Sequence, residues 1–347
     1  MYEVDFLPVE SDGESGSKCG DAIAIRFTYE GEGREAVVVI DGGYGDMGTS
    51  LVEHVKKYYD TSTIDLVIST HPDADHINGL VTVLEQADVR KLMVHRPRNH
   101  VRSLAEFSNI EKLDELIKTA ENLSIPIIEP FEGAQEFGGQ LTVCGPTEDY
   151  YVELLTQYLE EERTGKASAR RSSGSPVWSA IGRKFERMLS MIPIETLSND
   201  VETGPRNNMS VITHLKADGH NLLLTGDAGI PALDAAADFY ESTVGLISAE
   251  PFTLFQVPHH GSRRNAGPDL LDRLLGERNA SFGSTVAIIS SAEKCKDHPS
   301  PKVINALNRR DAIVAATEGK TLTHWNDAPD RPGWGPVAPL RYLPEDD

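Results

Sequence analysis

Side chains that commonly bind metal ions gather directly after an apolar run in the first quarter of the chain. The stretch "IDLVISTHPDADHINGL", residues 64–80, places His71, Asp73, Asp75 and His76 within six positions. Imidazole and carboxylate groups are usual protein ligands of divalent cations such as Zn²⁺ and Mn²⁺. The stretch is therefore interpreted as a metal-binding loop, and the alternative is a solvated polar turn.

Three more strand-like runs end in residues of the same kind. They are 36–40, followed by Asp41; 221–225, followed by Gly226 and Asp227; and 252–257, followed by His259 and His260. Polar residues at strand ends converge on one edge of a sheet. A site with two metal ions that is assembled from loops requires several such strand ends, and the sequence offers four.

The spacing His-x-Asp-x-Asp-His allows one loop to serve two ions. In a tight turn, His71 and Asp73 can face one ion while Asp75 and His76 face a second. Two cations about 3.5–4 Å apart need a shared ligand, and several carboxylates to offset their charge. Asp227 is the candidate for the shared ligand.

The composition is that of an ordinary globular protein. Among 347 residues, 39% are hydrophobic and 25% are charged. No apolar run approaches the roughly 18 residues of a membrane helix. The N-terminal "MYEVDFLPVESDG" has neither the basic start nor the apolar core of a secretory signal. Cys19, Cys144 and Cys295 form no Cys-x-x-Cys pair, which argues against disulfides and a thiolate zinc site. These features predict a cytoplasmic protein.

The charge distribution bears on the kind of partner. The formal net charge of −21 repels polyanions at long range and disfavours a general nucleic-acid coat protein. Residues 89–102 and 163–174 depart from this average because both stretches are locally basic. Each is either a solvated surface or a basic rim suited to a phosphate-bearing substrate.

Short runs rich in valine and isoleucine alternate with helical patterns along the chain. Strands are predicted at 22–29, 35–43, 64–70, 209–216, 221–227, 252–257 and 285–291, and helices at 49–59, 103–123 and 231–240. Two sheets packed face to face with helices outside would accommodate this order, which gives an α/β (α+β) fold. Residues 150–200 are interpreted as an insertion or lid within a domain at 1–326, and residues 327–347 as an irregular tail.

Taken together, these landmarks resemble those of the metallo-β-lactamase superfamily. "THPDADH" (70–76) is similar to its His-x-His-x-Asp-His motif, with Asp73 in place of the second histidine. The other matching landmarks, in the same order, are Asp-Gly-Gly at 41–43, Gly-Asp at 226–227 and His-His-Gly-Ser at 259–262. The resemblance implies an αββα sandwich of two mixed β-sheets flanked by helices, with the site where these loops meet.

A narrower resemblance connects the chain with the ComEC-type metallo-β-lactamase domain, which is related to DNA internalisation. It rests mainly on "NNMSVITHLKADGHNLLLTGD" (207–227) and "VPHHGSRRN" (257–265). As in such domains, Asn207 and Asn208 stand where most of the superfamily carries a strand-end histidine. The nearest histidine, His214, is expected to be packed within a strand or to lie on the surface.

Residue by residue, the resemblance implies a set of metal ligands. They are His71, Asp73, Asp75, His76, Asp227 and one of His259 and His260. His259 is preferred because it comes first after the strand, which leaves His260 as a substrate-facing group. Oxygen ligands at the first position favour a harder ion, so the expected cofactors are two divalent ions, Mn²⁺ or Zn²⁺.

Catalytic and supporting roles are assigned around these ligands. Asp75 would hold the second ion and orient the attacking hydroxide, and His260 or His298 would protonate the leaving group. Residues expected to support the site or to contact the substrate are Asp41, Asn207, Asn208, Ser262, Arg263 and Arg264.

The leading hypothesis is a metal-dependent hydrolase, specifically a phosphodiesterase or nuclease that cleaves DNA with a hydroxide activated by two metal ions. The alternatives are hydrolysis of a small phosphodiester, such as a phosphocholine ester or a cyclic nucleotide, and a non-catalytic sensor module. A β-lactamase is disfavoured because Asp73 and Asn208 replace two zinc-binding imidazoles. The expected partners are nucleic acid or another phosphodiester and an unidentified protein, but no membrane.

Overall fold

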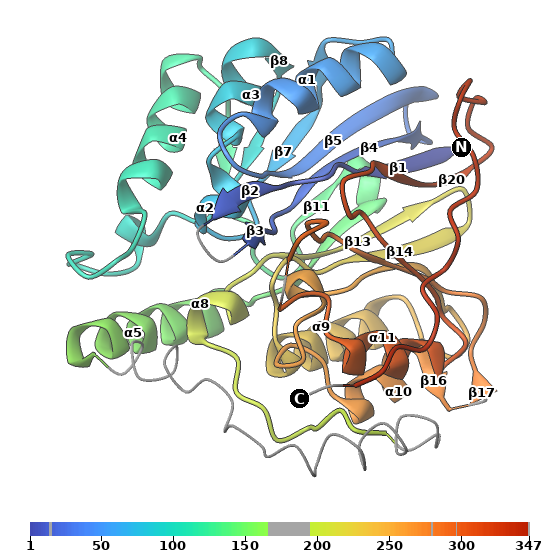
Figure 1. Ribbon diagram of the computed structural model, residues 1–347. Helices are drawn as coiled ribbons and strands as arrows, with labels where there is room; N and C mark the ends of the chain where they lie inside the picture. The colour runs from blue at the N-terminus through green and yellow to red at the C-terminus, as the bar shows by residue number, and fades with distance from the viewer. Residues whose placement is uncertain (14–15, 166–194, 279, 296, 346–347) are drawn as a thin grey trace.

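Two seven-stranded sheets pack face to face, and helices cover the outer face of each (Figure 1). The computed structural model describes residues 1–347 except 14–15, 166–194, 279, 296 and 346–347. Both sheets mix parallel and antiparallel strands. The predicted αββα sandwich with two mixed sheets is therefore confirmed.

The first sheet joins a parallel half to an antiparallel half. Its strands span Tyr2–Phe6 (β1), Ala22–Tyr29 (β4), Arg34–Gly42 (β5), Leu66–Ile68 (β7), Leu92–Met93 (β9), Ile127–Ile128 (β10) and Leu322–Asn326 (β20). They lie in the order β10-β9-β7-β5-β4-β1-β20. The strands from β5 to β10 are parallel to one another, and those from β5 to β20 are antiparallel.

The second sheet has the same division into halves. Its strands span Gln135–Glu136 (β11), Leu141–Gly145 (β12), Ile212–Ala217 (β13), His220–Leu224 (β14), Phe252–Gln256 (β15), Val286–Ile289 (β18) and Ile313–Ala316 (β19). They follow one another in this order across the sheet. The strands from β14 to β19 are parallel, and those from β11 to β14 are antiparallel.

Shorter strand pairs lie outside the two main sheets. They are Ser11–Gly13 (β2) with Gly16–Lys18 (β3), Thr63–Ile64 (β6) with Asp88–Val89 (β8), and Gly276–Glu277 (β16) with Ala280–Ser281 (β17).

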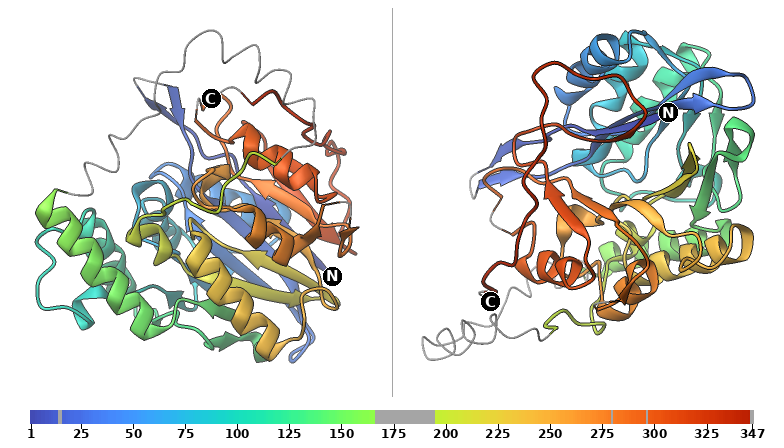
Figure 2. Two further views of the ribbon diagram at one scale, coloured as in Figure 1. Left: turned by 90° about the horizontal axis from the view of Figure 1, so that it is seen from below. Right: turned by 90° about the vertical axis from the view of Figure 1, so that its right-hand side faces the viewer.

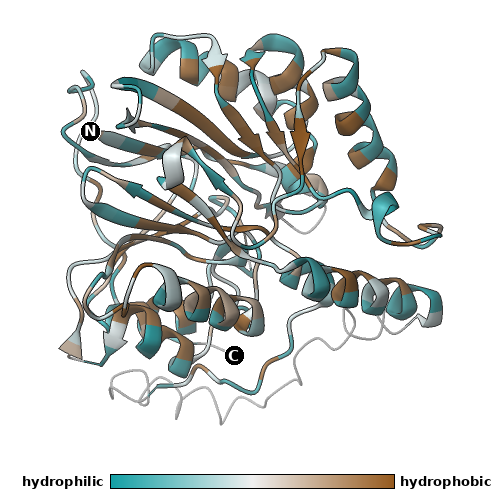
Figure 3. Ribbon diagram, turned by 180° about the vertical axis from the view of Figure 1, so that it is seen from behind, coloured by the Kyte–Doolittle hydropathy of each residue, from teal (hydrophilic) through white to brown (hydrophobic). Residues whose placement is uncertain are grey.

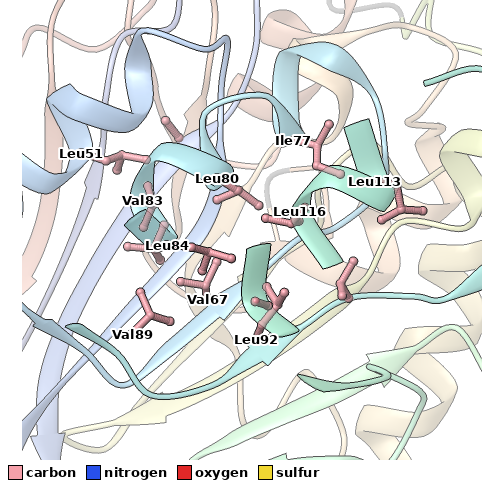
Figure 4. Packing of buried hydrophobic residues seen from close by; sticks show 14 of the residues in the cluster. Leu51, Val67, Ile77, Leu80, Val83, Leu84, Val89, Leu92, Leu113 and Leu116 are labelled. Atoms are coloured by element: carbon pink, nitrogen blue, oxygen red, sulfur yellow. The ribbon is translucent and has the colours of Figure 1, made fainter. Parts of the chain in front are cut away.

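The outer layers consist of amphipathic helices whose apolar sides face the sheets (Figure 3). The helices are Met47–Tyr58 (α1), Ala74–Ile77 (α2), Leu80–Gln86 (α3), Ile110–Asn122 (α4), Glu148–Thr164 (α5), Pro205–Asn208 (α8), Ile230–Thr243 (α9), Pro268–Leu275 (α10) and Pro301–Asn308 (α11). One buried apolar cluster lies between the sheets, and one lies under each helical layer. Figure 4 shows Leu51, Val83 and Leu113 of three helices packing near Val67 and Leu92 of the first sheet.

The parallel halves of the sheets determine where the polar loops lie. Residues 37–40 of β5 are all apolar and buried because this strand is covered on both faces, by α-helices and by the second sheet. The carboxyl ends of β5 and β7 are adjacent, and so are those of β14 and β15. The residues that follow these four strands are the ones in which the sequence predicts the metal site.

Two segments of the predicted domain organisation remain predictions. The expected insertion at 150–200 begins within α5, and residues 166–194 of it lie outside the described residues. After β20, the described residues 327–345 contain no helix or strand, and they pass from the first sheet to the helices of the second (Figure 2). Leu340 is held there because its main-chain nitrogen donates to the oxygen of Val314 at 2.8 Å.

Across the part of the chain that the structure describes, no helix combines the length and apolar character needed to span a bilayer.

His214 was expected either to be packed within a strand or to lie on the surface. It is packed within β13 of the second sheet. It is 3% exposed, and its ring contacts the rings of Tyr240 and Phe252. Its Nε2 lies 3.0 Å from Oδ1 of Asn221, to which it donates. Burial lowers the pKa of His214 to about 4, although the hydrogen bond to Asn221 acts in the opposite direction.

We expect protonation of His214 to destabilise the protein as the pH falls below neutrality. Its pKa is about 4 in the folded chain and near the ordinary 6.5 in the unfolded chain, so the unfolded chain takes up the proton first. The contribution to stability is complete above about pH 6.5 and decreases towards pH 4, by about 2 kcal/mol between pH 7 and pH 5. Urea unfolding of wild type and His214→Phe at both pH values measures this difference. Phenylalanine takes up no proton, so an equal loss of stability in both proteins would contradict the expectation.

Candidate metal centre

Loops from both sheets bring imidazoles and carboxylates together at one edge of the sandwich. From the first sheet, His71 follows β7, Asp73 caps the amino end of α2, and Asp75 and His76 lie within that helix. From the second sheet, Asp227 follows β14, and His259 and His260 lie in a 3₁₀ turn after β15. All residues that the sequence predicts as ligands are therefore neighbours in the structure.

The carboxylate of Asp227 lies at the centre of this group and is 3% exposed. Its Oδ2 is 3.6 Å from Nε2 of His71 and 3.6 Å from Nε2 of His259. Its Oδ1 is 3.4 Å from Nε2 of His76 and 3.9 Å from Nε2 of His260. Each oxygen of Asp227 therefore faces a different pair of imidazoles.

One further carboxylate belongs to each pair. Oδ2 of Asp73 is 3.5 Å from Nε2 of His71. Oδ2 of Asp75 is 3.6 Å from Nε2 of His260 and 4.0 Å from Nε2 of His76. We call the two groups the first position (His71, Asp73, His259 and Oδ2 of Asp227) and the second position (Asp75, His76, His260 and Oδ1 of Asp227).

Some of these donor atoms lie close enough together to share one divalent cation: Asp75, His76 and His260 at the second position, and His71, His76 and Asp227 between the two positions. Two donors on one ion, each about 2.1 Å from it, lie no more than about 4.2 Å apart. Every separation within the two positions given above lies between 3.4 and 4.0 Å. Nε2 of His71, His76 and His260 and Oδ1 of Asp227 are buried without a hydrogen-bond partner. Unpaired buried polar atoms are costly, and a divalent cation bound among these four atoms would provide the partner that they lack.

Asp41 contacts one imidazole directly and a second one through Thr70. Its Oδ2 accepts a hydrogen bond from Nδ1 of His76 at 2.7 Å and another from the hydroxyl of Thr70 at 2.6 Å. Oγ1 of Thr70 in turn lies 3.0 Å from Nδ1 of His71, from which it can accept. With their protons on Nδ1, both histidines direct the lone pair of Nε2 into the centre.

The adjacent pair His259 and His260 is oriented in the same way. Nδ1 of His260 donates to the main-chain oxygen of Ser290 at 3.0 Å. Nδ1 of His259 lies 3.0 Å from Oδ1 of Asn265 and 2.9 Å from the amide of Asn207. The amide nitrogen of Asn265 donates to main-chain oxygens, so its Oδ1 is the acceptor for His259.

A left-handed turn allows these neighbouring histidines to reach different positions. The φ angles of His259, His260 and Gly261 are 48°, 55° and 78°. A side chain at residue 261 would be strained at this φ, and its Cβ would lie 2.8 Å from Cβ of Pro299. The sequence left open which of the two histidines binds metal, and the geometry provides a place for both.

Arg206 holds Asp73, although the sequence prediction did not include it. Its Nε contacts Oδ1 of Asp73, which leaves Oδ2 of that carboxylate facing the first position. The guanidinium donates to the hydroxyl of Tyr158 at 2.8 Å and to the main-chain oxygen of Pro72 at 2.9 Å. In the sequence, only the position of Arg206 directly before Asn207 indicated that it could lie near the centre.

Asp21 is a second residue that the prediction missed. Its fully buried carboxylate lies 3.8 Å from Nδ1 of His76 and accepts from Nε2 of Gln256 at 3.0 Å. Oε1 of Gln256 accepts from the main-chain nitrogen of Thr225 at 2.8 Å. Asp21 and Gln256 therefore connect the second position to the turn that carries Asp227.

The electrostatics of the centre favour positive charge. Burial alone would lower the pKa of His260, but Asp227 and Asp75 raise it to about 9. Burial also opposes protonation of His76, yet Asp227 and Asp41 raise its pKa well above the ordinary value. Burial would raise the pKa of Asp227, but the surrounding imidazoles hold it well below its usual range. Cations bound at the two positions would replace the imidazole protons.

The remaining predicted residues surround the two positions. The ring of His298 lies 5.6 Å from that of His259 and 6.5 Å from that of His260. Burial and these two imidazoles lower the pKa of His298 to about 3, so it is neutral near pH 7. The predicted role of His260 or His298 as proton donor stays a prediction.

Asn208 and Ser262 stabilise turns next to the centre. Oδ1 of Asn208 accepts from the main-chain nitrogen of Gly229 at 3.0 Å. The hydroxyl of Ser262 accepts from the main-chain nitrogen of Arg264 at 3.3 Å. The side chain of Arg263 is exposed beside this turn.

Comparison with known families supports the superfamily resemblance. Residues 25–143 match the family model of the Metallo-beta-lactamase superfamily. The matched segment includes the loop that carries His71 to His76, whereas Asp227 and the histidine pair lie beyond it. No curated protein matches the sequence significantly.

Two solved structures match this chain at low sequence identity and with TM-scores below 0.5. A Thermotoga maritima protein provisionally assigned as a metallo-beta-lactamase is 12% identical, with a TM-score of 0.35 over 65% of this chain and 78% of that chain. Unliganded yeast PDE1 is 11% identical, with a TM-score of 0.45 over 92% of this chain and 98% of that chain. The narrower ComEC-type resemblance stays a prediction.

We expect the two adjacent histidines to control different ions. The wild-type protein should bind two equivalents of Mn²⁺ or Zn²⁺, and His259→Ala and His260→Ala should each bind one, because each removes an imidazole from one position. Asp227→Asn should weaken both. Elemental analysis and calorimetric titration after chelation measure the stoichiometry, with His220→Ala as a matched control outside the centre. Binding of two ions by both alanine variants would contradict this assignment.

Replacement of Arg206 should weaken the first position selectively. Arg206→Gln removes the charged group that holds Asp73, and loss of such an outer partner typically lowers metal affinity by about 10- to 100-fold. Calorimetric titration with Mn²⁺ should show a weaker first ion and a nearly unchanged second ion. Equal weakening of both ions would instead indicate a general loss of structure.

Proposed function

We propose that the protein is a metal-dependent phosphodiesterase that cleaves DNA. The observation that carries the proposal is the carboxylate of Asp227, whose two oxygens face two separate groups of metal-ligand atoms. Two divalent ions sharing a carboxylate are typical of enzymes that hydrolyse phosphate esters. Ions bound there would polarise a phosphoryl oxygen, lower the pKa of water towards about 7 and neutralise the charge that develops in the transition state.

Charge balance supports two ions rather than one. Asp21, Asp41, Asp73, Asp75 and Asp227 bring five carboxylates to the centre, and Arg206 contributes one positive charge. With neutral imidazoles and ionised carboxylates the group would carry four negative charges. One divalent ion would leave uncompensated negative charge in a largely buried site, which is unfavourable. A second ion removes this excess.

The donor types suit the predicted metals. Each position offers two imidazole nitrogens and two carboxylate oxygens. Such mixed nitrogen and oxygen donors bind Zn²⁺ and Mn²⁺, whereas Mg²⁺ and Ca²⁺ prefer oxygen alone. A metal that prefers more than four ligands would have room for a substrate oxygen.

The open side of the centre shows how a substrate would approach. The side chains of Asp73, Asp75 and His259 are 31%, 28% and 31% exposed, whereas those of His71 and His76 are fully buried. Ser262 and Arg263 lie beyond His260 in the sequence and are suited to contact phosphate oxygens. Positive charge here contrasts with the net charge of −21 on the whole chain and favours a phosphate ester over a neutral carbonyl substrate.

Hydrolysis by metal-stripped protein resupplied with Mn²⁺, Zn²⁺ or Mg²⁺ tests the proposal. We expect cleavage of single- or double-stranded DNA and of bis-p-nitrophenyl phosphate only after metal is restored. Asp227→Asn should reduce the rate by about 100-fold or more, because it removes the charge shared by both positions.

The controls separate the alternatives. His220→Ala should retain activity, and RNA should be tested beside DNA. Cleavage of the small ester alone would favour a phosphocholine ester or a cyclic nucleotide as the natural substrate class. If both ions bind and none of these substrates is cleaved, the phosphodiesterase proposal is wrong and the sensor hypothesis gains support.

A further inference from the structure

A cavity of about 370 Å³ is lined by residues 196–202, by the two arginines that follow the histidine pair in the sequence, and by Lys302. Three cationic side chains line it: Arg263, Arg264 and Lys302. The hydroxyl-bearing residues Thr196 and Ser198 line it as well. Its volume lies within the range of about 300–1,000 Å³ that is usual for ligand sites.

Each wall of the cavity leads directly into the metal centre. The wall formed by residues 196–202 continues into α8, whose Asn207 lies against His259 (Figure 1). Arg263 and Arg264 follow the histidine pair within four residues. Lys302 lies in the first turn of α11, and the main-chain nitrogen of residue 300 donates to the oxygen of residue 261 at 3.0 Å. The segments that line the cavity are therefore connected to those that carry His259 and Asn207.

The walls are also connected to one another by well-defined contacts. The hydroxyl of Thr203 donates to the main-chain oxygen of Arg264 at 2.7 Å. The main-chain oxygen of Thr203 lies 3.4 Å from the amide nitrogen of Asn208. These bonds hold the segment before α8 against the turn that carries the two arginines, so the cavity has a fixed shape.

The lining groups have the chemistry of a site for a phosphodiester chain. Guanidinium and ammonium groups bind phosphate oxygens through charge-assisted hydrogen bonds. Asp200 and Glu202 also line the cavity, and carboxylates accept hydrogen bonds from sugar hydroxyls and from exocyclic amines of bases. None of the described residues that line the cavity is aromatic. An aromatic cage for a quaternary ammonium group is therefore missing from this wall, which disfavours a choline ester.

We propose that this cavity binds the strand next to the scissile phosphodiester, which makes the substrate a nucleic-acid strand rather than a small ester. This inference rests on the proposed phosphodiesterase function and specifies its substrate class. Arg264 and Lys302 contact phosphates on one side of the cleavage point. Because the rest of the chain is strongly acidic, these local contacts are needed for a polyanion to remain at the metal centre.

Arg264→Gln and Lys302→Gln test the inference, with Lys56→Gln on the exposed face of α1 as a matched loss of one positive charge. The first readout compares kcat/KM for a labelled single strand with kcat/KM for bis-p-nitrophenyl phosphate, as a ratio. The strand has about 12 nucleotides, a length within the usual range of single-strand binding sites. Each cavity variant should lower this ratio about tenfold, the effect of a lost hydrogen bond to a charged group. Lys56→Gln should leave the ratio as in wild type.

The second readout is binding, which does not depend on catalysis. Fluorescence anisotropy of the labelled DNA strand, and of an RNA strand of the same length, gives Kd for each variant in the metal-loaded protein, with phosphorothioate linkages that keep the charge and slow cleavage. The slope of log Kd against log salt concentration should decrease by about 0.7 for each phosphate contact that is lost.

The outcomes separate the two proposals. If wild type cleaves the strand but neither the ratio nor Kd changes in the cavity variants, the inference is wrong and the phosphodiesterase function stands. If no substrate is cleaved while Arg264→Gln and Lys302→Gln still weaken strand binding, the cavity assignment stands and the proposed reaction is wrong. Absence of strand binding by any of the proteins would overturn the inference.

Discussion

The carboxylate of Asp227 is the constraint on which the arrangement of the metal centre depends. It can serve two positions only if each oxygen keeps its direction, and its main chain is fixed accordingly. Its nitrogen donates to the hydroxyl of Ser210 at 3.2 Å, and its oxygen accepts from the amide of Asn265 at 2.8 Å. These partners lie before β13 and after the histidine pair, so two separate loops hold the turn in place.

Both sheets contribute equally to each position, which connects metal binding with the stability of the fold. The first position combines His71 and Asp73 of the first sheet with Asp227 and His259 of the second. The second position is divided in the same manner. A cation at either position therefore joins the two sheets at this edge, where their loops carry buried atoms without hydrogen-bond partners. Metal affinity and the docking of the sheets must reinforce each other, because a ligand set assembled only in the folded state stabilises that state.

The sequence predicted the parts of the site that depend on local pattern. Apolar runs that end in carboxylates or imidazoles identified the loops correctly, because parallel strands carry their following residues to one edge. Arg206 and Asp21 escaped prediction because their roles depend on contacts between distant segments. The strand Tyr2–Phe6 was missed for a related reason: its acidic Asp5 is buried among partners from distant segments, where Arg331 donates to it at 2.8 and 2.9 Å and the hydroxyl of Tyr59 at 2.7 Å.

The absence of a histidine at residues 207–208 does not reduce the number of imidazoles at the centre. Asn207 lies where a strand-end histidine would be expected, and its amide is 2.9 Å from Nδ1 of His259. The segment thus places an amide against an imidazole instead of supplying one. The adjacent His260 serves the other position through a left-handed turn, a conformation that costs about 1–2 kcal/mol for each non-glycine residue. Because both residues lie in one strained turn, its left-handed backbone is needed to complete either position, whereas each imidazole faces one position alone.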